Sequence, residues 1–564
     1  MPALLDDQID AAIARITSDD GLLPVGRIES RGQSLPCFAA APPTLPAYFT
    51  HFCTLYGDRT FLVDGEERLT FADTLAFARR CAAGLVARHG VKKGDRVGIA
   101  ARNGNGWIIA YMGVLMAGGI ATLLNGFWTG EEMCEAICDV GCSLVLADGK
   151  RQAQIRDCGG AEATNVVWFR QSVGVEEGLA DLWGDPDAVT LPALSGEDDA
   201  TILFTSGSTG RSKGAVSQHR AVVHGALNFA VSTVAALEVL TIRGTPPEHL
   251  PASLLNVPLF HVTAEVSVFL LSFAIGRKLV MMHKWDAEEA MRLIEREKIT
   301  YFVGVPLMSY EIAIHPRRGD YDLSSMKDVS AGGAPRPPEQ VRVIADNLAG
   351  SHPVLGYGLT ETNAVGCVNI REEYLRKPAS TGRACKPLVD IAILDDTGTA
   401  LAQGQIGEIA IRSVACIDRY WNRPDDNARL FTADGYLRTG DLGYLDPDNY
   451  LFIVDRKKDI IIRGGENISS VEVEAALYAL PHVRECAVFS LPHERYGEVP
   501  AAVVHLDADA AMDARGLRAA LAGHLASFKI PERVWLSAEP LPRLGTEKID
   551  KRTLQQRYRA LAAG

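Results

Sequence analysis

A segment rich in glycine and hydroxyl side chains offers the clearest chemistry in this chain of 564 residues. It follows the apolar residues Ile202-Leu203-Phe204, which predict a buried strand. Glycines let a backbone bend tightly and bring its N–H groups close to an anion, while hydroxyl groups add donors and a lysine adds a mobile positive charge. The segment therefore predicts a phosphate-binding loop made of Thr205, Ser206, Gly207, Ser208, Thr209, Gly210, Arg211, Ser212, Lys213 and Gly214.

This loop differs from a Walker A loop at the positions on either side of its lysine. Ser212 stands before Lys213 where a Walker A loop has glycine, and Gly214 follows where it has serine or threonine. The ordinary alternative is a flexible Ser/Gly linker. The apolar strand in front and the single arginine and lysine disfavour that alternative.

The loop and several further segments resemble, in the same order, the motifs of the adenylate-forming superfamily, which includes acyl- and aryl-CoA synthetases, peptide-synthetase adenylation domains and beetle luciferases. The resemblance spans about residues 48–552. It implies an enzyme that uses ATP to convert a carboxylic acid into an acyl-adenylate and then into a coenzyme A thioester. The matching segments are residues 205–214, 357–362, 437–441, 455–459 with 464–468, and 541–549.

The chemistry of the nucleotide-site residues agrees with the roles that the resemblance implies. Tyr357 offers a flat face for an adenine ring, and Glu361 is a hard oxygen ligand for Mg²⁺ that the ATP phosphates mainly hold. Thr360 can hydrogen-bond a phosphoryl oxygen. Asp441 is an acceptor-only group that matches two ribose hydroxyls, and Arg456 can donate to the ribose from the other side. For Asp441 alone, a helix N-cap or a turn is the ordinary alternative.

Glycines and one alanine complete the nucleotide site in the resembling family. The resemblance adds Gly358 to the adenine-binding motif. It places Gly332, Gly333 and Ala334 between the adenine and the acyl pocket.

Lys548 matches the family's C-terminal catalytic lysine. In adenylation a carboxylate attacks the α-phosphate, and negative charge spreads over the phosphoryl oxygens in the transition state. A lysine that a closing domain delivers would neutralise that charge where it develops. Glu547 stands before this lysine where the family often has glycine. For the residue alone, an exposed, solvated lysine is the ordinary alternative.

Lys458 occupies the family's hinge position within the charged cluster of residues 455–459. The resemblance implies that the C-terminal domain rotates there between the two half-reactions. Residues 462–468 would then line a pantetheine tunnel, which assigns coenzyme A binding to Arg463, Gly464, Gly465 and Glu466. A surface turn is the ordinary alternative for the glycine pair.

The acyl pocket is the least determined part of the sequence. Residues 258–262 resemble the motif that borders this pocket, and His261 would gate between acid and thiol, although a packed core histidine is the ordinary alternative. The other candidates are small or apolar, which favours a medium- or long-chain fatty acid or a bulky ring-containing acid. They are Val262, Val305, Gly332, Leu355 and Gly356. Asp286 is expected to cap the following helix rather than to bind an amino group.

Strands alternating with helical patterns from about residue 48 to 450 must position these residues. Such alternation predicts parallel or mixed sheets covered by helices. We expect an α/β and α+β fold with a large N-terminal AMP-binding domain, residues 1–457, and a small mobile C-terminal α+β domain, residues 458–564. Residues 1–45 form a lead-in to the first of these domains.

Composition excludes several classes of protein. A formal net charge of −13 gives no reason to bind nucleic acid, and the chain shows no signal peptide. The apolar run of residues 107–124 predicts a buried helix, a glycine turn and a short strand rather than a membrane span.

The eleven cysteines are expected to be reduced thiols of a cytoplasmic protein. Cys134, Cys138 and Cys142 are expected to be buried small side chains on one helical face, with zinc as the disfavoured alternative.

Three functions remain open at this point. The first is a carboxylic acid–CoA ligase that uses ATP, Mg²⁺ and coenzyme A. The second transfers the acyl group to the pantetheine of a carrier protein, although no carrier domain is visible in this chain. The third is a nucleotide-binding protein without catalysis, which the presence of Lys548, Glu361 and Asp441 disfavours. The sequence leaves open whether the protein is a monomer or a homodimer.

Overall fold

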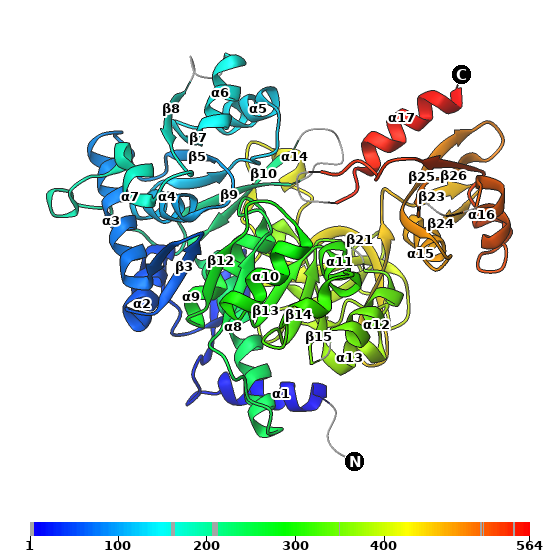
Figure 1. Cartoon of the computed structure of the whole chain (residues 1–564), viewed down its shortest axis with the longest axis horizontal. Coiled ribbons are helices and arrows are strands. Elements are labelled where there is room, and N and C mark those ends of the chain that lie inside the picture. The colour runs from blue at the N-terminus through cyan, green and yellow to red at the C-terminus, as the bar shows by residue number, and fades with distance from the viewer. Residues whose placement is uncertain are drawn as a thin grey trace.

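The computed structural model describes residues 5–159, 164–205, 212–334, 336–348, 350–507, 510, 512–544 and 548–563. The predicted loop residues Ser206, Gly207, Ser208, Thr209 and Gly210, and also Glu547, lie outside the described residues. Mixed α/β layers form the larger part of the molecule, and a smaller lobe carries the C-terminus (Figure 1).

A seven-stranded sheet carries the start of the predicted phosphate loop. Its order is β20-β10-β9-β6-β5-β7-β8; the strands from β9 to β8 are parallel, and β10 is antiparallel to both of its neighbours, β9 and β20. Helices α3 (Phe71–Ala87), α4 (Asn105–Met116), α5 (Gly130–Val140) and α6 (Gly149–Asp157) alternate with its strands. The strands are β5 (Arg96–Ala100), β6 (Ile120–Leu123), β7 (Leu144–Asp148), β8 (Asn165–Phe169), β9 (Asp199–Thr205), β10 (Lys213–Gln218) and β20 (Arg419–Tyr420).

A nine-stranded sheet carries the predicted adenine motif and the glycine segment. Its order is β17-β16-β15-β14-β13-β11-β12-β3-β4, and its strands from β15 to β3 are parallel. The strands are β3 (Thr60–Asp64), β4 (Glu67–Thr70), β11 (Ala252–Leu255), β12 (Lys278–Met281), β13 (Tyr301–Gly304), β14 (Asp328–Gly332), β15 (His352–Gly358), β16 (Gly366–Ile370) and β17 (Arg383–Ala384).

The connections of the nine-stranded sheet are mostly helical. Asp286 caps α10, where its carboxylate accepts a hydrogen bond of 2.8 Å from the Glu289 N–H, and this confirms the predicted cap. A π-helix, η4 (Thr263–Leu270), follows the His261 motif and continues into α9 (Leu271–Ala274). The other helices are α2 (Leu45–Tyr56), α8 (His219–Ile242), α10 (Ala287–Glu297), α11 (Pro306–Ile314), α12 (Pro338–Asn347) and α13 (Arg371–Arg376).

Short elements complete these two layers. They are α7 (Val175–Gly178), α14 (Pro424–Asn427), and the 3-10 turns η2 (Ala180–Leu182), η3 (Pro186–Ala188), η5 (Arg318–Asp320) and η6 (Thr360–Thr362).

The apolar run of residues 107–124 folds as predicted. Every residue of helix α4 except the half-buried Gly106 is buried, Gly118 turns the chain at a φ of 83°, and β6 follows as a fully buried strand. Since the helix is apolar on every side, it is a core helix of this fold. Among the helices of the described residues, α8 alone has the length and apolar composition of a membrane span, and here it packs against α1 (Leu5–Ile16), α2 and α9.

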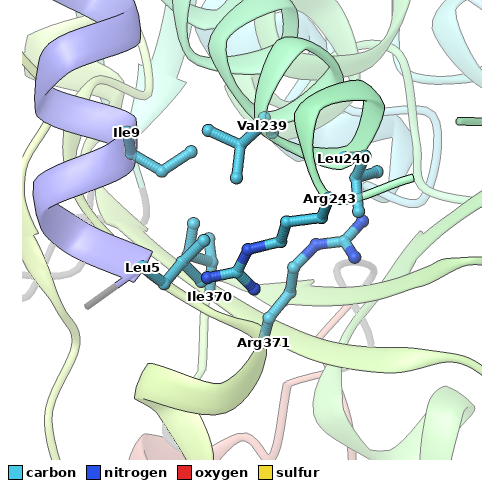
Figure 2. A pocket seen from close by; sticks show the side chains of 8 residues that line it. Leu5, Ile9, Val239, Leu240, Arg243, Ile370 and Arg371 are labelled. Carbon is cyan, nitrogen blue, oxygen red and sulfur yellow. The ribbon is translucent and has the colours of Figure 1, made fainter. Parts of the chain in front are cut away.

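The lead-in is folded onto the rest of the N-terminal region. Helix α1 lies along α8, and a small cleft separates α1 from β16 (Figure 2). Asp10 binds Arg383 at 2.7 Å, and the Tyr450 hydroxyl donates to Asp6 at 2.6 Å. A two-stranded hairpin, β1 (Val25–Ser30) and β2 (Gln33–Phe38), follows the helix.

The chain then forms two further sheets. The four-stranded sheet β18-β19-β21-β22 is antiparallel, and the last sheet belongs to the C-terminal lobe (Figure 1). Residues 457–460, which include Lys458, connect β22 to β23. The domain boundary at 457/458 stays a prediction. The strands of the first sheet are β18 (Asp390–Leu394), β19 (Gly407–Arg412), β21 (Leu437–Leu445) and β22 (Leu451–Arg456).

The C-terminal lobe has one sheet and three α-helices among its described residues. Its strands are β23 (Ile461–Arg463), β24 (Glu466–Ile468), β25 (Val483–His493), β26 (Gly497–Leu506) and β27 (Arg533–Ser537). Its helices are α15 (Ser470–Tyr478), α16 (Ala514–Leu521) and α17 (Lys551–Ala563), with the 3-10 turn η7 (Ser527–Lys529).

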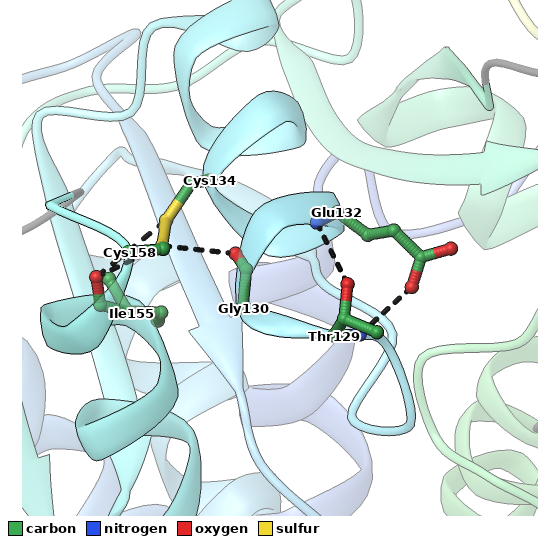
Figure 3. The surroundings of a disulfide bond; sticks show 6 residues. All are labelled: Thr129, Gly130, Glu132, Cys134, Ile155 and Cys158. Carbon is green, nitrogen blue, oxygen red and sulfur yellow. Dashed lines mark hydrogen bonds between the residues drawn. A yellow bond between two sulfur atoms is a disulfide. The ribbon is translucent and has the colours of Figure 1, made fainter.

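The cysteines correct two expectations. Cys134 on α5 forms a disulfide with Cys158 at the end of α6, because these helices pack side by side, so not every cysteine is a free thiol (Figure 3). Gly141 ends α5 in the left-handed conformation, so Cys142 lies beyond the helix and the three cysteines do not share one helical face. Cys142 is buried as expected, whereas Cys138 is exposed.

Candidate active site

The ends of β9 and β10 bring the two flanks of the predicted phosphate loop together. Thr205 and Lys213 are antiparallel partners, so the loop leaves and re-enters the sheet at one place. The Lys213 ammonium lies 2.7 Å from Asp426 and over the Tyr420 ring, 5.2 Å from its centroid. Lys213 therefore stands at the first position of β10, with a carboxylate and an aromatic face beside it.

Strands β15, β21 and β22 bring three predicted nucleotide residues together. The Tyr357 hydroxyl donates to Asp441 at 2.8 Å, and Arg456, the cross-strand partner of Asp441, places its Nε 3.5 Å from the other carboxylate oxygen. Burial raises the pKa of Asp441, and the positive charge of Arg456 opposes this rise. The arrangement offers an aromatic ring, an acceptor and a donor within one small region.

Glu361 lies in η6, directly after β15. Asn363 closes this turn in the left-handed conformation, and its amide donates to the Ala415 carbonyl at 2.8 Å and to Ser217 of β10 at 3.1 Å. The Tyr420 hydroxyl donates to Oε1 of Glu361 at 2.6 Å. Thr360 precedes Glu361 and is half-buried. This turn therefore holds a carboxylate beside the sheet edge that carries Lys213.

Glycines leave room at the ends of β14 and β15. Gly332 and Gly356 are paired across the two parallel strands. A Cβ on Gly356 would meet no atom within 4 Å, and one on Gly332 would meet only the Gly356 carbonyl, at 3.6 Å. A Cβ on Gly358 would instead lie 2.0 Å from the Ala364 carbonyl, so this position requires glycine. Gly333 turns the chain at a φ of 76°, and Ala334 follows it half-buried.

Lys548 of the C-terminal lobe reaches the N-terminal glycine segment. A Cβ on Gly333 would lie 3.2 Å from Cε and 3.4 Å from Nζ of Lys548. Burial and the charge of Arg456 together lower the pKa of Lys548 to about 8, against the opposing charge of Asp441. A lysine with this pKa is still mostly protonated at pH 7, so the lobe delivers a desolvated positive charge to this place.

His261 is a neutral side chain in this site. Burial, together with the charge of Lys548, lowers the pKa of His261 to about 3. Its Nδ1 accepts a hydrogen bond of 3.4 Å from the Thr263 N–H, and its carbonyl accepts one of 3.0 Å from the Glu265 N–H. His261 is therefore positioned at the start of η4 and carries no charge at physiological pH.

The apolar residues predicted for the acyl pocket do not form one wall. Val262 packs in the large core around α4, and Val305 packs with Met308 under α11. Leu355 packs with Val341 and Tyr374 on α12 and α13. The structure thus separates these side chains, and Gly332 and Gly356 are the predicted pocket residues that face open space.

The residues predicted for coenzyme A form a hairpin in the C-terminal lobe. Arg463 and Glu466 are cross-strand partners, and Gly464 and Gly465 make the turn between them at φ values of 60° and 94°. Arg463 donates to the Phe528 carbonyl at 2.9 Å and lies over the Tyr496 ring. Arg463 therefore packs within the C-terminal lobe, against Phe528 and Tyr496. Lys458 is exposed.

The sequence interpretation missed three residues near this site. Tyr420 and Asp426 carry no spacing that marks them, because β20 has only two residues. Glu265 in η4 is wholly buried, and the Tyr111 hydroxyl donates to its Oε1 at 2.7 Å. A single carboxylate within the apolar run of residues 262–275 was the available signal for Glu265.

Comparison with known proteins agrees with this geometry. Residues 49–421 match the family model "AMP-binding enzyme", and residues 472–548 match "AMP-binding enzyme C-terminal domain". The chain belongs to the AMP-binding enzyme family. Within this family it is an AMP-forming acyl-CoA synthetase, an enzyme that uses ATP and coenzyme A.

Three similar proteins illustrate the relationship. The long-chain-fatty-acid–CoA ligase FadD13 of Mycobacterium tuberculosis is 33% identical over 87% of this chain and 94% of its own length. Feruloyl-CoA synthase of an Amycolatopsis species is 32% identical over 88% and 95%. The structure of ATP-bound MatB from Rhodopseudomonas palustris aligns with a TM-score of 0.80 at 27% identity, and covers 91% of this chain and 99% of that one.

Proposed function

We propose that this acid–CoA ligase activates an apolar carboxylic acid, either a medium- or long-chain fatty acid or a bulky ring-containing acid. The observation that carries the proposal is the position of Lys548 beside Gly333, the residue that follows Gly332, where Gly332 and Gly356 leave open space. One relative is named for long-chain fatty acids and another for ferulate, a ring-containing acid. Apolar surface buried in such a space contributes about 25 cal/mol per Å² to binding.

In the first half-reaction, the substrate carboxylate attacks the α-phosphorus of ATP. A bond forms between a carboxylate oxygen and phosphorus, and the bond to the diphosphate leaving group breaks. The carboxylate is ionised at pH 7 and needs no general base. Lys548 stabilises the charge that develops on the phosphoryl oxygens, and its desolvation strengthens this interaction.

We assign the remaining nucleotide roles as the family resemblance implies, and the contacts of the site support them. Tyr357 and Gly358 bind the adenine, while Asp441 and Arg456 bind the ribose hydroxyls. Thr360, Lys213 and the loop after Thr205 bind phosphates. Mg²⁺ would lower the negative charge of the diphosphate, and Glu361 fits as its ligand because Tyr420 occupies only one of its oxygens.

In the second half-reaction, the coenzyme A sulfur attacks the acyl carbon and AMP leaves with both electrons of the broken bond. We assign Lys458 as the hinge that exchanges the faces of the C-terminal lobe. Arg463, Gly464, Gly465 and Glu466 then border the pantetheine chain, and His261 gates the passage between acid and thiol. The homodimer and the cytoplasmic location stay predictions.

Acid-dependent exchange of labelled diphosphate into ATP tests the proposal. The panel runs from butanoate to hexadecanoate and includes benzoate, cinnamate and several amino acids. We expect exchange with apolar acids and a preference over amino acids of about 10³-fold, because burying an unpaired ammonium costs several kcal/mol. An amino acid as the best substrate would overturn the pocket assignment. Thioester formation with free coenzyme A, compared with carrier-protein pantetheine, separates the ligase from the carrier-dependent alternative.

A further inference from the structure

One side chain contacts both candidate phosphate-site charges. The hydroxyl of Tyr420 donates to Oε1 of Glu361 at 2.6 Å, and the face of its ring lies 5.2 Å from the Lys213 ammonium. Glu361 comes from the turn after β15, whereas Lys213 begins β10. Tyr420 therefore connects a carboxylate of the nine-stranded sheet with an ammonium of the seven-stranded sheet.

The backbone of Tyr420 is fixed from two sides. It pairs with Ala215 across β20 and β10. Its N–H donates to Oδ1 of Asn427 at 2.7 Å, and the Asn427 amide donates to its carbonyl at 2.9 Å. Asn427 ends α14, the same short helix that holds Asp426 against Lys213 at 2.7 Å. The ring and the hydroxyl are thus attached to a backbone that does not move independently of Lys213.

The two contacts suit a divalent cation between a carboxylate and a polyphosphate. Because the hydroxyl donates to Oε1, it orients the carboxylate and leaves Oε2 as the oxygen that can reach a metal ion. Burial and the neighbouring Glu361 charge raise the pKa of Tyr420, so the hydroxyl keeps its proton. The ring face attracts the ammonium and limits its positions.

We infer that Tyr420 is a positioning residue that fixes Glu361 and Lys213 relative to each other for binding of the ATP phosphates and their Mg²⁺. The inference rests on the proposed roles of these two residues. A tyrosine that only filled space would affect stability and leave the metal requirement of the reaction unchanged. The Mg²⁺ concentration that the reaction requires therefore distinguishes a positioning role of Tyr420 from a space-filling role.

The experiment measures acid-dependent diphosphate exchange by the full-length chain while Mg²⁺ is varied at fixed ATP. Tyr420→Phe removes the hydroxyl and keeps the ring. We expect it to raise the half-saturating Mg²⁺ concentration about 10-fold, the scale for losing one hydrogen bond to a charged group. The KM of the acid should stay within about twofold. Tyr420→Leu removes the ring as well, and should additionally raise the KM for ATP because Lys213 loses the aromatic face.

Tyr444→Phe is the matched control, since Tyr444 stacks on Phe452 in the four-stranded sheet and contacts neither charge. The melting temperatures of all variants show whether each still folds. An unchanged Mg²⁺ requirement in an active, folded Tyr420→Phe enzyme would overturn this inference and leave the proposed function standing. A wild-type chain that exchanges with no acid at any Mg²⁺ concentration would overturn the proposed function and this inference with it.

Discussion

Lys548 combines a positive charge with burial, and this combination predicts how the adenylation half-reaction depends on pH. Its pKa is lowered to about 8 in the free enzyme, so kcat/KM for ATP in diphosphate exchange should fall as pH rises past about 8 and the charge is lost. Lys548→Arg should move this decline to higher pH, because guanidinium stays charged. Lys548→Ala should lower exchange by about 10²-fold and remove the decline.

Thioester formation from a supplied acyl-adenylate is the control for Lys548→Ala, and it should remain largely intact. If the decline above pH 8 persists in the alanine variant, another group is responsible for it.

Single residues differ in how far the sequence predicts them. Asp441, Tyr357 and Arg456 belong to recognisable motifs, and the structure brings all three together. Tyr420 and Asp426 reach the site only because β20 pairs with β10, and neither residue type nor spacing encodes that pairing. The separation of Val262 from Leu355 has the same origin, because Val262 precedes η4 and Leu355 lies in β15, and their relative position depends on tertiary packing.

The π-helix η4 contains a buried carboxyl group that gives this element a pH-dependent stability. Burial raises the pKa of Glu265 to about 8, and the hydrogen bond from Tyr111 only partly opposes the rise. The folded state therefore binds this proton more tightly than the unfolded state does. The contribution is present at low pH, and it is lost as pH rises from about 4.5 through 8, at up to about 1.4 kcal/mol per unit.

Glu265→Gln should flatten the decline in the free energy of unfolding between pH 5 and pH 9, measured by urea titration. Glu66→Gln, at an exposed position, is the control and should leave the slope unchanged. An equal slope in the wild type and in Glu265→Gln would show that Glu265 does not titrate in this range.

Strands β14 and β15 carry the paired glycines Gly332 and Gly356, which border the proposed acyl space. Gly356→Val should fold normally, because its Cβ meets no atom within 4 Å. The added methyl groups would occupy the space, so kcat/KM for bulky acids should fall at least about 10-fold relative to butanoate. Gly319→Val is the control, since that glycine also faces open space but lies in the surface turn η5. Equal losses for short and bulky acids would contradict this placement.

Elements were predictable where apolar runs were bounded by glycines. The run of residues 107–124 gave a correct helix, turn and strand because Gly118 breaks it. The cysteine pattern was misleading, since the regular spacing of Cys134, Cys138 and Cys142 continues past the end of α5 at Gly141. Pairing of Cys134 with Cys158 depends on the packing of α5 against α6, which spacing alone does not reveal.

At the scale of the whole molecule, the connection at residues 457–460 joins the C-terminal lobe to the rest of the chain and contains the proposed hinge, Lys458. Hydrogen bonds of this turn are made by the N–H groups of Lys457, Asp459 and Ile460. Proline at 458 would therefore restrict φ without removing one of these bonds. Lys458→Pro should preserve adenylation and abolish thioester formation, measured separately as diphosphate exchange and as acyl-CoA production.

Lys458→Ala is the control for this variant and should support both half-reactions. Wild-type rates of both half-reactions in Lys458→Pro would exclude rotation about this residue.

The mixed sheets and the small C-terminal lobe were predictable from strand–helix alternation and from the change in composition near residue 455. The order of strands in the nine-stranded sheet was not predictable, because β3 and β4, from residues 60–70, join strands that all lie within residues 252–384. The folded lead-in was also unforeseen. Its contacts depend on Arg383 and Tyr450, which lie more than 370 residues away in the sequence.

Helix α1 provides a fixed reference point for observing the molecule in motion. Its ion pair with Arg383 and its packing on α8 attach the start of the chain to the large region, while α17 at the other end belongs to the small lobe (Figure 1). Two fluorophores, one on α1 and one on α17, would therefore report the distance between these two helices as an energy-transfer efficiency. The proposed rotation about Lys458 predicts that single molecules alternate between two such distances during turnover.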